Sequence, residues 1–303
     1  MTRPVLAGAR ARRRTRLLVS ITGALLASIL GFFAYMAHRL THPARVPEPV
    51  NPSHFLLTSK DVFWGAPDGG QISGWWIPGQ EGAPGILLAP GYGMSRSDGL
   101  SLAAVLNKDG FNLLTYDARG SGARPTGKST LGLLEVGDMM AALNFLRATA
   151  GVNPNRLGIW GVDVNARAAL KAAASIRQIR AVAADSAYDS IADFIGAKLA
   201  EDFGWQSRIT EFGCLRMFQL LSFSASSALN QRLSVTELLD KDILFIQGEN
   251  RGEFARCTTA LYNRVRPQKE LIQLPVSRVR FMSGDEIRDY DSHVRSFFRL
   301  CLQ

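Results

Sequence analysis

Short, continuous apolar runs recur along this chain and alternate with segments of helical periodicity. The runs at 85–89, 111–116 and 157–160 contain few polar residues, as expected of strands that are buried on both faces. The segment 131–148 instead places its apolar residues at helical spacing. Strands that alternate with helices in this way predict a mostly parallel sheet with helices on both faces. The sequence therefore predicts an α/β fold.

Further elements extend the series in both directions. Before it, Asp68-Gly69-Gly70 separates two apolar runs, which is typical of a β-hairpin. After it come three more predicted strands and two more helices. These are strands at 181–184, 242–246 and 270–274 and helices near 253–265 and 288–302.

A strand–turn–helix unit lies in the middle of the series. The strand 157–160 leads into Gly161-Val162-Asp163-Val164-Asn165, and an alanine-rich helix follows. A nucleophile elbow, in which G-x-S-x-G holds a reactive serine at a strained bend above a sheet, has this setting. Here Asp163 stands at the serine position and Asn165 at the second glycine.

The N-terminal region predicts a membrane anchor. Residues 17–37 are uncharged and apolar, and as a helix they would span about 31 Å, close to the ~30 Å hydrocarbon core of a bilayer. Six arginines lie in the basic segment 1–16, so we expect a cytoplasmic N-terminus and a single-pass signal-anchor in the cell membrane, with the body on the non-cytoplasmic side. A cleaved signal peptide is the alternative. Gly23, Ala27 and Gly31 form a small-residue stripe through which two such helices could dimerise.

The anchor region also explains most of the positive charge. The chain carries +9, but residues 1–50 hold eight of its 35 basic residues and one of its 26 acidic ones. The remaining 27 basic and 25 acidic residues nearly balance, so a nucleic-acid partner is not expected. Four prolines between residues 38 and 52 predict a stiff, extended linker that lifts the body, residues 53–303, off the membrane.

The regular alternation is interrupted between about 187 and 240. This stretch is long, helical in pattern and rich in large apolar residues, among them Phe194, Phe203 and Phe218. We interpret it as a helical lid over a ligand pocket; the alternative is that these residues only pack among themselves. The three cysteines, Cys214, Cys257 and Cys301, lack metal-ligand spacing, and we expect neither a metal nor a cofactor.

The order of these motifs resembles the α/β-hydrolase superfamily, and within it membrane-anchored bacterial relatives of serine aminopeptidases and esterases. The resemblance rests on segments 68–78, 87–96, 116–122, 161–165, 184–186 and 243–248. It implies a hydrolase fold with a helical lid, an unknown small-molecule or acyl/peptide ligand under that lid, and the catalytic order nucleophile, acid, histidine.

The three catalytic positions all depart from that pattern. Asp163 replaces the nucleophilic serine, and Asn250 or Arg251 occupies the place of the acid. Glu249, Glu253 and Asp185 are conceivable substitutes for that acid. The loop 275–280, which would carry the histidine, contains none. Of the four histidines, His38, His42 and His54 lie in or near the linker, and His293 falls on the apolar pattern of the last helix.

Two interpretations follow. In the first, the chain is a non-catalytic binding or regulatory member of the superfamily, because all three positions of the triad are changed. In the second, it hydrolyses ester or amide bonds by rearranged chemistry that uses Asp163 as a nucleophile or base. In either case the backbone N–H groups of Tyr92 and Val164 would remain as oxyanion-type donors, because they require no particular side chain.

Overall fold

The central sheet has the strand order β1-β2-β4-β3-β5-β6-β7-β8 in the part of the chain that the structure describes. This computed structural model describes residues 4–44, 50–121, 128–204, 207–222, 226–266 and 269–303. The strands are β1 (Lys60–Gly65), β2 (Gln71–Ile77), β3 (Ala83–Ala89), β4 (Asn112–Tyr116), β5 (Val152–Val162), β6 (Ile179–Asp185), β7 (Asp242–Gly248) and β8 (Lys269–Leu274).

The predicted α/β architecture is confirmed. All pairings from β4 to β8 are parallel, whereas β1 and β2 pair antiparallel as a hairpin and β2 pairs antiparallel with β4. The turn of the hairpin contains Gly69 at a φ of 83°, a conformation that glycine adopts without steric cost. Every residue of β4 is buried, which accounts for the absence of charged residues from this strand.

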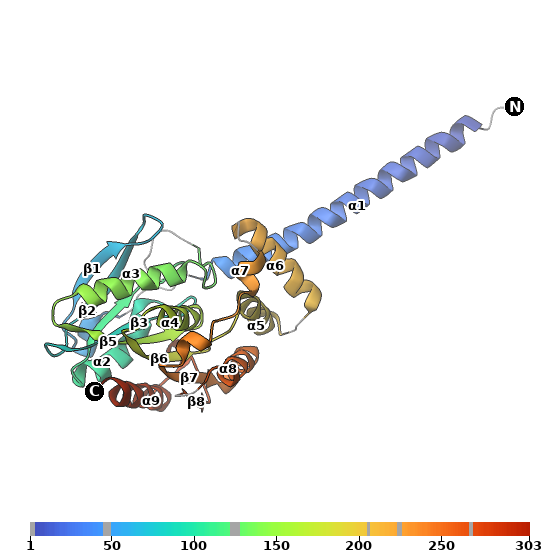
Figure 1. Ribbon diagram of the computed structural model, residues 1–303. Coiled ribbons are helices and arrows are strands. Elements are labelled where there is room, and N and C mark those ends of the chain that lie inside the picture. The colour runs from blue at the N-terminus through green and yellow to red at the C-terminus, as the bar shows by residue number, and fades with distance from the viewer. Residues whose placement is uncertain (1–3, 45–49, 122–127, 205–206, 223–225, 267–268) are drawn as a thin grey trace.

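Helices cover both faces of this sheet (Figure 1). On one face α2 (Leu100–Lys108) and α9 (Asp285–Leu302) share an apolar cluster with the strands. On the other face lie α3 (Glu135–Ala148), α4 (Val164–Ser175) and α8 (Glu253–Arg264). The alanines of α4 let its backbone approach the sheet closely, and nine of its residues are buried. This packing fixes the start of α4, and therefore the elbow, above the end of β5.

Among the described residues of the irregular stretch between β6 and β7, three α-helices form an insert ahead of a short 3-10 helix (Thr236–Leu238). They are α5 (Ile191–Phe203), α6 (Arg208–Ser222) and α7 (Ser226–Asn230). Figure 1 shows this insert at the point where the first helix leaves the body. Its buried residues belong to a third apolar cluster, which also contains residues of that first helix.

The first helix, α1 (Pro4–Thr41), is the one helix among the described residues that is long and apolar enough to cross a membrane. It passes the expected end of the anchor at residue 37 by four residues, because Ala37, Leu40 and Thr41 are buried against the body. The first part of the predicted linker is therefore helical, and α1 packs on the body instead of holding it away. Residues 45–49 of that linker lie outside the described residues.

Candidate functional site

Asp163 occupies the bend between β5 and α4. Its φ of 48° and ψ of −112° are strained for a residue with a side chain, which is the backbone state expected of an elbow. Gly161 is needed beside it, because a Cβ there would lie 2.5 Å from the carbonyl oxygen of Asn165. Asn165 is fully buried, and its amide donates to the carbonyl oxygen of Pro90 in the loop after β3. The elbow is therefore present and is tied to the neighbouring strand.

Two buried arginines hold the Asp163 carboxylate, one on each oxygen. Nη2 of Arg251 donates to Oδ1 at 2.9 Å, and Nε of Arg278 lies 3.0 Å from Oδ2. The exposed fractions of the three side chains are 1% for Asp163, 3% for Arg251 and 9% for Arg278. Ion pairs so far removed from water interact strongly but are also costly to desolvate.

The two arginines come from the strand ends that the resemblance assigns to the acid and the histidine. Arg251 lies in a 3-10 helix (Glu249–Arg251) directly after β7, and Arg278 lies in the loop after β8. Carboxyl ends of adjacent parallel strands meet at one edge of a sheet, which brings these side chains to Asp163. The three triad positions therefore meet in space, but they form a guanidinium–carboxylate–guanidinium cluster.

Further contacts hold each arginine in place. Nη1 of Arg251 donates to Oε1 of Glu201 on α5, and its guanidinium stacks 4.2 Å from the ring centre of Phe254. Burial alone would raise the pKa of Glu201, but the charges of Arg251 and Lys198 outweigh it and lower that pKa. The insert is thus joined electrostatically to the elbow through Arg251.

Arg278 is held through its backbone as well as its side chain. Its φ is 70°, its amide N–H donates to Oδ2 of Asp185 at 3.2 Å, and Nη2 donates to the carbonyl oxygen of Tyr92. The hydroxyl of Tyr290 donates to the same Asp185 oxygen at 3.0 Å, and Nε1 of Trp160 donates to that hydroxyl at 2.8 Å. Burial, with the nearby charge of Asp163, raises the pKa of Asp185 to about 6.

These contacts sort the candidates for the acid. Arg251, and not Asn250, points at the elbow, whereas Oδ1 of Asn250 accepts from the Ser277 amide at 3.2 Å. Asp185 instead accepts a hydrogen bond from the backbone N–H of Arg278. Glu249 accepts from Gln273, and Glu253 pairs with Arg256. None of the three substitute acids has a histidine partner among the described residues.

The four histidines, all of them described, have partners elsewhere. His38 and His42 stack on each other with ring centres 4.0 Å apart near the end of α1. His54 closes a capping box with Asn51. Nε2 of His293 lies 3.6 Å from Asp289, and its side chain is 45% exposed. His293 thus lies within the last helix, on its exposed side and not on the buried face that carries the apolar pattern.

The loop carrying Tyr92 packs directly on the carboxylate. A Cβ on Gly91 would lie only 3.0 Å from Oδ2 of Asp163, so the carboxylate fills the space beside this loop. Tyr92 and Val164 are both buried in the third apolar cluster. That cluster also contains Met36, Ala37 and Leu40 of α1, so the end of α1 covers the region over the elbow. The role of Tyr92 and Val164 as oxyanion donors stays a prediction.

A cavity lies on the far side of Arg251 from Asp163. Its volume is about 420 Å³, and it opens between the end of α5 and the start of α8. Its lining is rich in charge and includes Glu201, Arg251, Glu253 and Arg256. Asp163 is not among the lining residues, because Arg251 stands between the carboxylate and the cavity.

Arg278 is the site residue that sequence reasoning missed. The sequence pattern draws attention to its loop only through the absence of a histidine, and it does not mark the arginines there as partners of the elbow. An acid at the buried elbow position requires a counter-charge, and Arg251 and Arg278 stand at two neighbouring strand ends. That combination was the signal available in the sequence.

Comparison with known proteins supports the fold and leaves the activity open. No protein-family model matches the chain. It is 31% identical over 142 residues to the uncharacterized protein YfhR of Escherichia coli K12, covering 45% of this chain and 49% of that protein. It is 29% identical over 133 residues to a thiohydrolase of Eupenicillium brefeldianum, covering 43% of each. The chain thus matches about half the length of these relatives.

Solved structures match over nearly the whole body. The esterase Pf2001 of Pyrococcus furiosus superposes with a TM-score of 0.66 at 22% identity, covering 87% of this chain and 99% of that one. The α/β hydrolase GrgF of Penicillium sp. sh18 superposes with a TM-score of 0.58 at 16% identity, covering 81% and 99%. The sheet order, the elbow and these matches together identify the chain as a protein of the α/β-hydrolase fold, with sequence similarity to hydrolase-like members of that superfamily.

Proposed function

We propose that this chain is a membrane-anchored member of the α/β-hydrolase superfamily that binds a ligand without hydrolysing it. The observation that supports this most directly is the pairing of Asp163 with Arg251 and Arg278. The elbow residue has become the centre of a buried ionic cluster, and the neighbouring strand ends supply its counter-charges.

The chemistry of the cluster argues against the alternative of an active hydrolase that uses Asp163. A carboxylate nucleophile must approach a carbon atom, but here each oxygen of Asp163 is engaged by a guanidinium group. Hydrolysis of the resulting ester would need a general base. Arginine stays protonated in proteins and cannot serve as that base.

The ligand site in this proposal is the cavity beside Arg251. Its walls combine two carboxylates with two guanidinium groups, Glu201 and Glu253 with Arg251 and Arg256. Convergent charged groups orient polar ligands, so this lining favours a peptide or another polar molecule over a long acyl chain. The insert contributes Glu201, which gives it the place of a lid in this proposal.

The anchor completes the proposal. The apolar segment of α1 and the arginines before it support a single span with a cytoplasmic N-terminus and the body on the opposite side. The exposed Gly23 and Gly31 leave room for a second helix, so dimerisation through that stripe remains part of the proposal.

One set of compounds tests hydrolysis and binding together. The full chain in detergent micelles is offered p-nitrophenyl esters of short and long acids, aminoacyl p-nitroanilides and short peptides. We expect no turnover above the detergent blank, while a peptide raises the unfolding temperature of the wild type. The Arg256→Ala variant should lose that rise, because the Arg256 side chain lines the cavity and is 80% exposed, so its removal leaves the core intact.

The Pf2001 esterase serves as a positive control for the esters. Turnover by the wild type that disappears in Asp163→Asn would contradict the proposal and favour the active hydrolase. A rise in unfolding temperature that is equal in wild type and Arg256→Ala would place the ligand outside this cavity.

A further inference from the structure

The docking of α1 brings the body close to the end of the apolar span. The uncharged segment runs from Leu17 to Ala37. Met36 and Ala37 are buried by the body and Phe33 packs against the insert, whereas Tyr35 is still 58% exposed. Helix from 17 to 35 spans about 28 Å, close to the ~30 Å thickness of the hydrocarbon core. A bilayer crossed by α1 therefore extends to the level at which Phe33 meets the insert.

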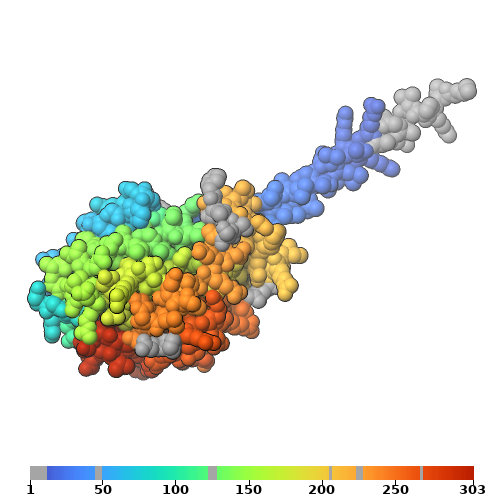
Figure 2. All heavy atoms as spheres, in the orientation of Figure 1, coloured from blue at the N-terminus to red at the C-terminus, as the bar shows by residue number. Residues whose placement is uncertain are grey.

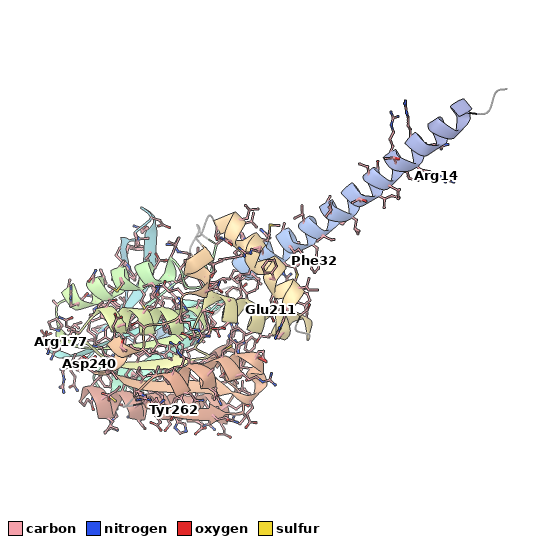
Figure 3. The ribbon with its side chains drawn as sticks, turned by 45° about the vertical axis from the view of Figure 1, so that its right-hand side comes forward. Arg14, Phe32, Arg177, Glu211, Asp240 and Tyr262 are labelled. Carbon is pink, nitrogen blue, oxygen red and sulfur yellow. The ribbon has the colours of Figure 1, made fainter. Side chains whose placement is uncertain are left out.

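Helix α6 runs beside α1 at this end of the apolar segment. The Phe33 ring lies against Gly213 so closely that a side chain at 213 would overlap it. Figure 3 shows Phe32 on α1 next to the insert that carries Glu211, and Figure 2 shows the surface of the insert at the base of the long helix. Any membrane crossed by α1 would therefore reach α6.

The outer face of α6 is apolar. Ile209, Phe212 and Leu220 are 78%, 60% and 67% exposed, and their spacing places them in one stripe along the helix. Arg216 lies on the same face with its guanidinium 5.0 Å from the ring centre of Phe212. An apolar stripe with an arginine that can extend toward water is typical of helices at a bilayer surface.

We propose that the apolar stripe of α6, formed by Ile209, Phe212 and Leu220, is immersed in the outer leaflet of the bilayer that α1 spans. The stripe continues the apolar surface of α1 at the end of its span, and Arg216 reaches the lipid phosphate groups. The body then rests on the membrane with its insert in the lipid. This inference rests on the proposed membrane anchoring, which the test below measures separately.

Fluorescence quenching in nanodiscs tests the immersion. Full-length chains with Cys214, Cys257 and Cys301 replaced by serine receive one cysteine, at Phe212, at Leu220 or at Leu300, and an environment-sensitive fluorophore. Leu300 is the matched control: it is 86% exposed and lies on α9, at the end of the body away from α1 (Figure 1). We expect lipids with a doxyl spin label to quench the 212 and 220 positions at least threefold more than position 300, and iodide to do the reverse.

Two outcomes would overturn the inference. Labels at 212 and 220 that iodide quenches as strongly as at 300 would mean that the stripe faces water. Labels shielded from both quenchers in discs with one chain each would mean that protein covers it. Either cysteine variant suffices if the other does not fold. Carbonate extraction of membranes that contain these chains tests the anchoring by itself. A chain that stays in the membrane but shows no quenching by the spin-labelled lipid refutes only the immersion of α6.

Discussion

Asp163 is a buried anion whose charge is needed by two buried cations. Each guanidinium has other partners, Glu201 for Arg251 and the Tyr92 carbonyl for Arg278, but Asp163 is the group they share. Removing one member of a buried ionic group is costly because the remaining charges stay desolvated, whereas replacing the whole group with apolar residues costs little. We therefore expect a single substitution in the cluster to lower the stability of the fold more than simultaneous replacement of all three residues by apolar ones.

We expect Asp163→Ala to lower the free energy of unfolding by about 3–5 kcal/mol, because it leaves Arg251 and Arg278 buried without their shared counter-charge. Chemical denaturation of the full chain in detergent measures this loss. Asp163→Ser should behave similarly and gain no esterase activity, since it restores the serine without a base.

A triple variant, Asp163→Ala with Arg251→Met and Arg278→Met, should recover most of that loss. The Asp285→Ala variant is the control, because that carboxylate is 93% exposed and its pair with Arg288 contributes little. An Asp163→Ala chain within about 1 kcal/mol of the wild type would show that water or movement of the arginines relieves the charges.

At the scale of elements, the contact between α1 and α6 depends on one glycine. Gly213 faces the Phe33 ring with no room for a Cβ. Glycine in the middle of a helix costs about 1 kcal/mol relative to alanine, so its presence in α6 is explained by the close approach of α1. The insert and α1 therefore form one packed unit.

We expect Gly213→Ala to weaken this unit although alanine is the better helix former. The matched control is Gly196→Ala on α5, where a Cβ would meet Glu211 at an ordinary 3.5 Å. Hydrogen–deuterium exchange should show faster opening of residues 33–41 and of α6 in the first variant and unchanged or slower exchange in the second. Equal exchange in the two variants would mean that the Phe33 ring moves aside without consequence.

Much of this arrangement could be predicted from local patterns. The strands, the hairpin, the elbow and the insert appear as apolar runs, turn residues and periodicity that neighbouring residues determine. The end of α1 could not, because Leu40 and Thr41 stay helical through burial against a body that is distant in sequence. Nor could the partners of Asp163, since Arg251 and Arg278 are 88 and 115 positions away and only the strand order brings them in.

For the whole molecule, buried carboxyl groups make stability depend on pH. Burial raises the pKa of Asp291 on α9 to about 7, whereas an unfolded aspartate titrates near 4. Between about pH 4 and 7 the unfolded chain releases this proton and the folded chain keeps it, so stability falls as the pH rises. Asp185, with its pKa of about 6, acts in the same direction.

We therefore expect Asp291→Asn to gain stability over the wild type as the pH rises. The advantage should grow by roughly 2–3 kcal/mol between pH 5 and pH 8, because about two pH units of that interval lie below the raised pKa. Denaturant unfolding at several pH values measures it. Asp289→Asn is the control on the same helix, since that side chain is 60% exposed. A constant difference between Asp291→Asn and wild type would show that Asp291 is not the group that titrates.

The mutual dependence of Asp163, Arg251 and Arg278 also bears on how the gene can change. A codon change that places serine at the elbow leaves two buried cations without their shared counter-charge, and a change that places a histidine at 278 leaves the elbow carboxylate with one partner. Each first step toward a Ser-His-Asp triad would carry a folding defect before any catalytic advantage exists. Such a triad could therefore arise at these positions only through several coordinated mutations.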